Sequence, residues 1–229
     1  DAVAKLKETN IPHLAKLARE GYAILTAIPS CTLMYKQELP LMFPDDADVQ
    51  AVKEAMWDPF EYLMARNVDG LLKTDFSKPL GKVAYHVPCH QRVQNIGPKT
   101  KEALSLVPGT EVDIIERCSG HGGSWGVMKG NFETALKVGK PAARQVAKSG
   151  RTFLASECPL AGVHLKQGID RLALGIDRAG QRPAELGQGT GGADGPGAAE
   201  LDLGNGVRGP GLLLAHRFRF GRFRGRRRR

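Results

Sequence analysis

The chain has 229 residues, of which 41% are hydrophobic and 25% charged, enough for one or two ordinary globular domains. Its net charge of +9 comes mostly from residues 176–229, which hold 11 Arg, 5 acidic residues and no Lys, so the rest of the chain does not have the charge typical of a nucleic-acid-binding protein. Four cysteines and no run of 18 apolar residues argue against a disulfide scaffold and a transmembrane helix. We therefore expect reduced thiols in a cytoplasmic setting. The first residues lack a signal-peptide pattern and an initiator Met, so we expect the native N-terminus to be missing.

The first part of the chain is predicted to be mainly helical, with a single strand. Apolar residues at helical spacing predict a helix over 11–20. The apolar, partly β-branched run 22–28 predicts a buried strand, which Cys31 follows. Residues 46–57 have the pattern of a second helix. Asp58, an N-cap residue followed by proline, predicts the start of a third helix that reaches about residue 66.

The second part alternates strands with helices, which is typical of an α/β fold. Apolar runs predict strands over 82–87, 111–116 and 152–155. A long helix is predicted over 131–148, after a glycine-rich turn. We therefore predict an α/β protein made of cysteine-rich units, each a small sheet flanked by helices.

A short internal similarity suggests that these units are repeats. Residues 12–21 and 141–150 share the spacing of Pro, Ala, a basic residue and Gly, and each segment is followed by a short strand and a cysteine. We therefore predict that 1–80 is the back half of a first repeat with linker helices, that 81–172 is a complete second repeat, and that 173–229 is a tail.

The tail differs in composition from the rest of the chain. It is rich in Gly and Arg and has no helical or strand periodicity, so we expect disorder. One interpretation is an RNA-binding arm in which Phe218, Phe220 and Phe223 alternate with arginines. The other, which the GC-rich codons of the favoured residues support, is an out-of-frame translation product.

The cysteines share one topological place, because each follows the end of a predicted strand. Ligands gather at that edge of an open α/β sheet, and helix N-termini there favour thiolates. Thiolates suit zinc, copper(I) or iron–sulfur clusters. A structural zinc site usually contains a close Cys-x-x-Cys pair, which this sequence lacks. The cysteines concerned are Cys31, Cys89, Cys118 and Cys158.

Three segments resemble the cysteine-rich CCG domain, namely 85–90 (YHVPCH), 116–126 (ERCSGHGGSWG) and 157–162 (ECPLAG). That domain occurs in the B subunit of heterodisulfide reductase, in the C subunit of anaerobic glycerol-3-phosphate dehydrogenase, and in iron–sulfur subunits of glycolate oxidase and lactate-utilisation complexes. The resemblance implies an electron-transfer subunit with an iron–sulfur cluster of the [4Fe–4S] type. It also implies a partner flavoprotein dehydrogenase, and a membrane-anchored or quinone-reducing acceptor at the inner face of the membrane. The chain would then be a component of an oxidoreductase without complete activity of its own.

The resemblance also implies a ligand set. The thiols that match the motif are those of Cys89, Cys118 and Cys158, with Cys31 from the incomplete repeat. Three positions where the full motif has Cys hold other residues, namely Met34, Ser119 and Ala161. Either Cys31 or a nearby histidine completes the set, or the domain is a scaffold without a cluster. The histidines nearest the motifs are His86, His90 and His121. We expect His86 and His90 to be polar or packing residues around the ligands rather than ligands, with hydrogen bonds to the sulfur atoms as a modest role.

Two further sequence features allow other functional interpretations. Cys89 beside His90 could form a nucleophile and base, although adjacent residues on a strand face opposite ways. The glycine run 120–126 lacks the Lys-Ser/Thr of a phosphate-binding loop, so we expect it instead to let the backbone pack closely near the site. Trp125, within that run, is predicted to lie in the core.

Overall fold

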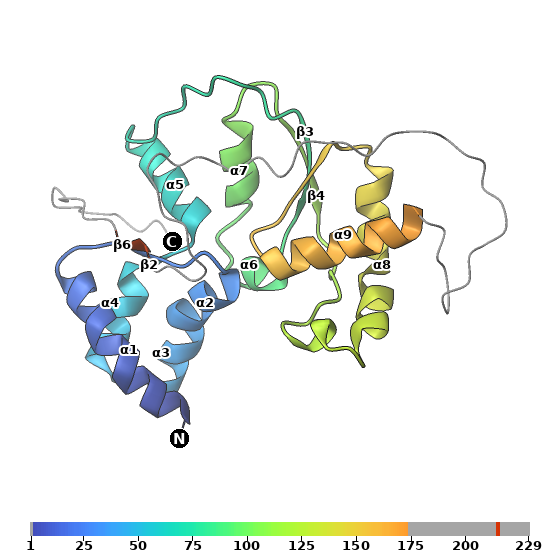
Figure 1. The fold of residues 1–229 in the computed structure, drawn as a ribbon. Coiled ribbons are helices and arrows are strands. Elements are labelled where there is room, and N and C mark those ends of the chain that lie inside the picture. The colour runs from blue at the N-terminus through green and yellow to red at the C-terminus, as the bar shows by residue number, and fades with distance from the viewer. Residues whose placement is uncertain (1, 174–213, 216–229) are drawn as a thin grey trace.

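The computed structural model describes residues 2–173 and 214–215. The N-terminal half consists of one long helix, α1, and several shorter helices around two very short strands (Figure 1). Its elements are α1 (Ala2–Arg19), β1 (Ile24–Leu25), α2 (Pro29–Leu33), the π-helical turn η1 (Met34–Glu38), α3 (Leu39–Met42), α4 (Ala47–Ala55), β2 (Met56–Trp57) and α5 (Pro59–Val68). Strands β1 and β2 are parallel, and β6 (Leu214–Ala215) pairs antiparallel with β1.

The second half is built on a three-stranded parallel sheet. Strand β3 is central and pairs along its whole length with β4, and with β5 over three residues. Figure 1 shows α7 on one face of the sheet and the pair α8 and α9 on the other. The elements are β3 (Lys82–His86), α6 (Cys89–Val93), α7 (Lys99–Ser105), β4 (Glu111–Ile115), the 3₁₀ turn η2 (Trp125–Val127), α8 (Phe132–Lys148), β5 (Phe153–Ala155) and α9 (Pro159–Ala173).

Each half has its own hydrophobic core. In the first, one face of α1 packs on α4, β1 and α3. In the second, α8 and α9 cover the sheet. The buried residues of the first cluster are Ile11, Leu14, Ala15, Ile24, Leu39, Val49, Val52 and Met56, and those of the second are Ala84, Ile115, Ala142, Ala143, Val146 and Leu165. The expected α/β fold with two small sheets flanked by helices is confirmed.

The predicted elements differ from the observed ones mainly in the first half. The predicted helix 46–57 ends at Ala55, and Met56 and Trp57 form β2 instead. Pro59 excludes the helical conformation for Asp58, which is extended and caps α5, so the chain must leave the helix before it. Only Ile24 and Leu25 of the predicted strand 22–28 pair, because β2 offers two residues.

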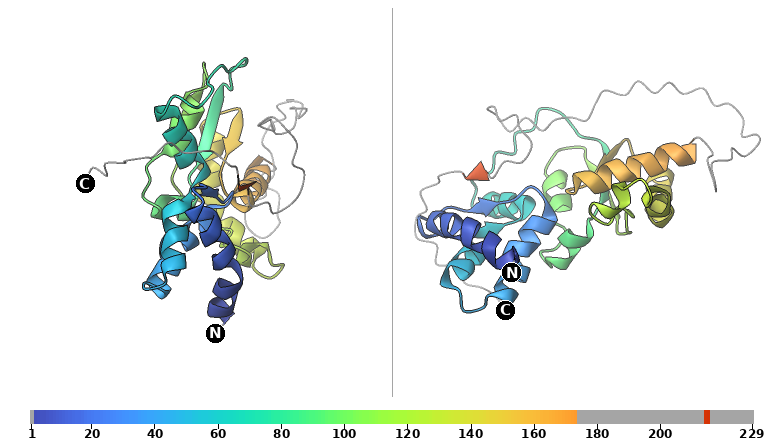
Figure 2. Two further views of the ribbon diagram at one scale, coloured as in Figure 1. Left: turned by 90° about the vertical axis from the view of Figure 1, so that its left-hand side faces the viewer. Right: turned by 60° about the horizontal axis from the view of Figure 1, so that its bottom comes forward.

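The two halves contact each other at several points. The Gln94 side chain, just after α6, donates a hydrogen bond to the Pro29 carbonyl in α2 at 3.3 Å. Helix α2 packs on α6, and α5 packs on α7. In the right-hand view of Figure 2, α2 lies on the side of the N-terminal half that faces the second half. The cysteine-bearing helix of the first half therefore lies against the helix that begins at Cys89.

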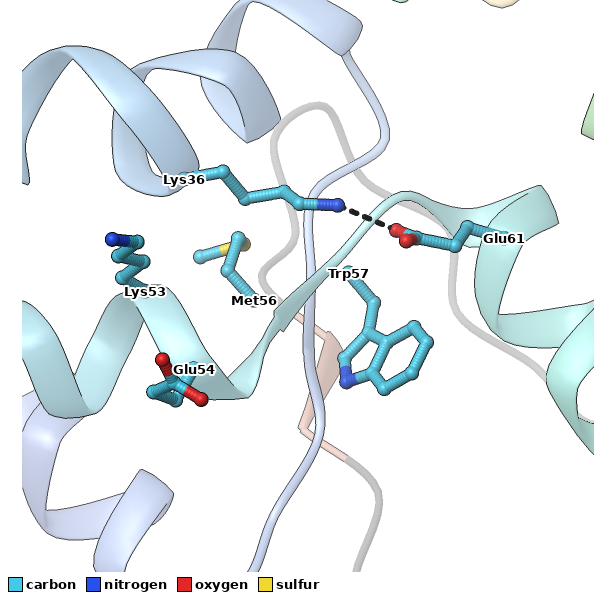
Figure 3. A pocket seen from close by; sticks show the side chains of 6 residues that line it. All are labelled: Lys36, Lys53, Glu54, Met56, Trp57 and Glu61. Carbon is cyan, nitrogen blue, oxygen red and sulfur yellow. Dashed lines mark hydrogen bonds and ion pairs between the residues drawn. The ribbon is translucent and has the colours of Figure 1, made fainter. Parts of the chain in front are cut away.

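A shallow hollow lies in the N-terminal half, away from three of the four cysteines. Figure 3 shows Lys36 crossing it to form an ion pair with Glu61, with an Nζ–Oε2 distance of 2.6 Å. Its volume of about 230 Å³ is below the roughly 300–1,000 Å³ typical of small-molecule pockets. Its other lining residues are Lys53, Glu54, Met56 and Trp57.

The predictions for the tail, that it is disordered and that it is either an RNA-binding arm or an out-of-frame product, concern residues outside the described ranges, apart from the short strand β6 and the last residue of α9. Within residues 2–173, no helix is both long and apolar enough to cross a membrane.

Candidate functional site

The cysteines of the second half gather at one edge of its sheet. Because β3, β4 and β5 are parallel and adjacent, their carboxyl ends lie side by side. Cys89, Cys118 and Cys158 each come three residues after the last residue of their strand. Cys89 opens α6 and Cys158 immediately precedes α9. The predicted common edge for these three thiols is therefore what the structure shows.

His86 connects the end of β3 to the loops that follow β4 and β5. It is the last residue of β3 and is buried. Its Nδ1 lies 3.2 Å from the Ser156 hydroxyl, and its Nε2 lies 2.9 Å from the Arg117 carbonyl, so it contacts the loops after β5 and β4. Burial lowers the pKa of His86 and favours the neutral ring. Since both ring nitrogens are occupied, His86 holds the edge in shape and is not free to bind a metal.

Cys89 and Cys118 form one side of the site. Burial raises the pKa of the Cys89 thiol, and the neighbouring Cys118, within hydrogen-bonding reach, raises it further. The Gly120 backbone N–H points to the Cys118 sulfur at 3.3 Å. A backbone N–H directed at sulfur stabilises a thiolate ligand. A raised pKa for Cys89 does not suit an activated nucleophile. His90 follows it on the same short helix, where adjacent residues do not face each other.

His121 forms the other side of the site, with Cys158 and Ser119. The His121 Nε2 lies 3.6 Å from the Cys158 sulfur, and its Nδ1 lies 2.8 Å from the Ser119 hydroxyl. Burial lowers the pKa of His121, and the nearby His164 and His90 lower it further. His121 is therefore a half-buried neutral imidazole in contact with one of the three thiols.

The glycine run lets this loop pack closely, as predicted. Gly120 has a φ of +88°, and a Cβ there would collide with the backbone of α8 at Ala135 and Gly139. Gly126 donates its N–H to the His121 carbonyl at 2.7 Å and lies so close that a side chain would meet the His121 backbone. The loop is thus anchored on both sides of His121. Trp125 is 44% exposed, so its prediction as a core residue is wrong; it begins the turn η2, in which only Gly126 is buried.

Buried polar groups behind the site were not predicted. Glu157, beside Cys158, accepts hydrogen bonds from the Tyr85 hydroxyl at 2.5 Å and from the Thr100 hydroxyl. Burial raises the pKa of Glu157. His164, on α9, is 2% exposed, neither of its ring nitrogens has a hydrogen-bond partner in the described part of the chain, and its ring packs edge-on against Phe132. The sequence signal for His164 was only its position six residues after a cysteine.

Cys31 lies in the first half, on the helix that packs against α6, which begins at Cys89. It lies within α2, half-buried, near Tyr35, whose pKa is raised by burial and by this thiol. The other three cysteines lie on the loops of the second sheet. At the motif positions without cysteine, Ser119 and Ala161 are both buried.

The donors at this edge are not arranged as a ready-made site for one metal ion. Between residues 2 and 173, no three His, Cys, Asp or Glu side chains are gathered closely enough to hold one metal ion. A zinc ion takes four ligands at about 2.0–2.3 Å, whereas a cluster carries its ligands on separate iron atoms. Here three thiols follow three adjacent strands, and the His121 imidazole contacts one of them, that of Cys158.

Comparison with protein families agrees with this geometry. Residues 83–166 match the cysteine-rich CCG domain, which confirms the resemblance noted in the sequence. The matched range contains β4, β5 and all of β3 except Lys82, together with Cys89, Cys118 and Cys158. No solved structure matches the chain.

Several curated proteins are similar to longer parts of the chain. The C subunit of anaerobic glycerol-3-phosphate dehydrogenase from Escherichia coli K12 is 27% identical over 161 residues, which are 69% of this chain and 40% of that protein. The B subunit of fumarate reductase (CoM/CoB) from Methanothermobacter marburgensis is 28% identical over 180 residues, 76% of this chain and 33% of that one. An uncharacterized iron–sulfur protein from Methanocaldococcus jannaschii is 36% identical over 105 residues, 44% of this chain and 20% of its own length. The chain thus spans two fifths or less of these relatives.

Proposed function

Because residues 83–166 form a cysteine-rich CCG domain, we propose that the chain is the iron–sulfur part of an oxidoreductase complex and carries single electrons through it. One observation carries this proposal. Cys89, Cys118 and Cys158 stand at equivalent positions after three adjacent parallel strands, so three thiols face one edge. The iron–sulfur and dehydrogenase or reductase subunits among the relatives support the same role.

The proposed ligands are these three cysteines, with Cys31 as the further candidate. When bound, a cluster supplies one-electron oxidation and reduction. The chain's own residues hold the ligands in place. The Gly120 N–H supports the Cys118 sulfur. The N-terminus of α9 lies next to Cys158, where helix dipoles favour a thiolate.

The proposed partners follow from the relatives. Two of them are subunits of a dehydrogenase and a reductase, which supports a multi-subunit assembly. The electron donor would be a flavoprotein dehydrogenase subunit, and the acceptor a quinone or another carrier. A cytoplasmic location, including attachment to a membrane-anchored partner at the inner face of the membrane, belongs to the same proposal.

A scaffold without a cluster is the second candidate, and one observation favours it. Ser119 and Ala161 are buried at positions where the full motif has cysteine, and Met34 replaces a third. Fewer thiolates weaken the hold on a cluster. In this case the same fold would serve only to bind partner subunits.

Anaerobic reconstitution of the full chain with iron and sulfide tests the proposal. We expect bound iron with a similar amount of acid-labile sulfide, and an electron paramagnetic resonance (EPR) signal that appears on reduction and disappears when a quinone analogue is added. A chain that binds no iron would support the scaffold. A chain purified with one zinc per molecule and no sulfide would contradict electron transfer.

A further inference from the structure

A cluster with four protein ligands needs one donor more than the three thiols provide. His121 lies close to one of these thiols. Its Nε2 lies 3.6 Å from the Cys158 sulfur, while its Nδ1 is 2.8 Å from the Ser119 hydroxyl. If Nδ1 carries the proton and donates it to Ser119, Nε2 has a free lone pair on the side of the thiol. Metal-binding histidines usually have this arrangement, in which one nitrogen binds and the other donates to a fixed acceptor.

The position of Ser119 in the motif adds to the argument from its contact with His121. Ser119 directly follows Cys118, where the CCG pattern has its second cysteine, and it is 4% exposed. A buried hydroxyl is costly without a partner, and its partner here is the imidazole two residues later. The replacement of a thiol at this position therefore comes with an imidazole directed toward the same group of thiols.

The loop holds His121 before any ligand arrives. On one side, Gly120 packs against the backbone of α8 so closely that no side chain would fit. On the other side, Gly126 bonds to the His121 carbonyl at 2.7 Å and leaves no room for a Cβ. A metal-binding side chain on a loop needs such support to keep its geometry.

The other candidate donors are less well placed. Both ring nitrogens of His86 are engaged by Ser156 and Arg117. His90 is exposed on α6, and Cys31 lies on α2 in the other half. His164 is 2% exposed, and its ring packs edge-on against Phe132.

We propose that His121 is the fourth protein ligand of the iron–sulfur cluster, binding through Nε2, and that Ser119 is a positioning residue that holds the ring through Nδ1. The inference rests on the proposed electron-transfer function. A set of three thiolates and one neutral imidazole carries one negative charge fewer than four thiolates. Less negative charge favours the reduced state, so the site would have a higher midpoint potential than an all-cysteine site.

The test uses the full chain labelled with ¹⁵N-histidine and reconstituted anaerobically with iron and sulfide. Electron–nuclear double resonance of the reduced protein detects a nitrogen bound directly to iron. We expect a strong ¹⁵N coupling in the wild-type chain and in His90→Ala, the matched control on an exposed neighbour. The coupling is lost in His121→Ala and in His121→Cys. His121→Cys keeps its iron, because a thiol replaces the imidazole, and its midpoint potential shifts downward.

Ser119→Ala tests the positioning role separately. Loss of the hydrogen bond to Nδ1 should weaken iron retention about 10- to 100-fold, the usual effect of removing a partner that orients a metal ligand. It should also change the size of the ¹⁵N coupling, which a merely structural role of Ser119 would leave unaltered.

The outcomes separate the two proposals. If the wild-type chain assembles a cluster with no ¹⁵N coupling, or if His121→Ala keeps the wild-type coupling, His121 is not a ligand and the electron-transfer function stands. If circular dichroism shows that His121→Ala is unfolded, His121→Cys decides, since a retained cluster with an unchanged potential and coupling overturns the assignment. If the wild-type chain binds no iron, both proposals fail together.

Discussion

The two halves of the molecule begin from a similar local pattern and reach different results. In both, a long helix with an internal proline, α1 or α8, leads to a short strand and then to a helix that starts with proline. In the second half the strand joins a parallel sheet whose central strand pairs over five residues. In the first half β1 and β2 pair over two residues. The strand ends there lead to Cys31 and to Asp58, which is buried and caps α5.

This comparison shows what the candidate site requires beyond a cysteine after a strand. The second half brings three strand ends together, and His86 fixes their loops. The first half has the Cys31 thiol on α2 and the Asp58 carboxylate, which caps the N-terminus of α5. The same helix–strand–cysteine order therefore produces a site only where neighbouring strands supply further donors.

The largest expected difference is in iron binding. Cys118→Ala should reduce the iron bound by the reconstituted chain at least as strongly as the roughly 10- to 100-fold typical for removing a ligand's supporting group. If His121 rather than Cys31 is the fourth ligand, Cys31→Ala, the matched change in the first half, should leave iron content unchanged. Iron and sulfide analysis of both variants measures this. Equal losses in the two variants would mean that both halves share the site.

Core substitutions compare the stabilities of the halves. Leu165, in the second core, is 1% exposed, and Leu14, in the first, is 5% exposed. Each change to Ala should lower the free energy of unfolding by about 2–5 kcal/mol. Because α2 packs on α6 and α5 on α7, we expect one unfolding transition for both variants. Leu160→Ala, at an exposed position, is the control. Two separate transitions in urea, only one of them shifted, would show that the halves fold independently.

Disturbing the close packing between α8 and the loop that carries His121 should lower stability by a smaller amount, and only in the second half. In Gly139→Ala, the new Cβ would meet the Ser119 backbone, so the loop that carries His121 must move. We expect a loss of about 1–3 kcal/mol in the free energy of unfolding, together with weaker iron binding. Gly130→Ala, where a Cβ meets open space, should change stability by less than about 0.5 kcal/mol. If the two variants behave alike in denaturant titrations, the close packing is unimportant.

The smallest expected effect on stability concerns the ion pairs between β4 and Arg151, which precedes β5. Arg151 bonds to Asp113 and Glu111 and lowers the pKa of both carboxyls below their ordinary values of 3.8 and 4.5. A lowered folded-state pKa stabilises the protein above the ordinary value, and this stabilisation is lost as pH falls through the folded-state value. Arg151→Gln should therefore be slightly less stable than the wild-type chain at neutral pH.

The difference between Arg151→Gln and the wild-type chain should shrink as the pH falls below the ordinary pKa values of 3.8 and 4.5, and should vanish once both carboxyls are protonated in either protein. Thermal unfolding over a pH series measures it. A difference that stays constant across the series would assign the effect to packing of the Arg151 side chain.

Much of the second half could be predicted from its sequence. The strands near Val83, Val112 and Phe153 are apolar runs bounded by turn residues, and they pair within a residue or two of the predicted limits. The common edge of the three cysteines followed from parallel topology alone. These predictions succeed because local pattern and tertiary packing agree there.

What could not be predicted depends on contacts between segments. Met56 continues the apolar pattern of α4, yet it forms a strand because Pro59 constrains the chain ahead and Ile24 offers a pairing partner. The contact between Ser119 and His121 depends on a loop shape that the close approach of Gly126 produces. No periodicity encodes such an approach, and the exposure of Trp125 follows from the same loop.

The Mössbauer spectrum of the full chain reconstituted anaerobically with ⁵⁷Fe tests the central claim most directly. If Cys89, Cys118 and Cys158 hold a cluster, the iron should give the quadrupole doublets of iron tetrahedrally bound by sulfur with shared valence, and these should be absent in Cys118→Ala. A spectrum with only mononuclear iron, or an identical spectrum in the variant, would contradict the claim that the edge of the second sheet binds an iron–sulfur cluster.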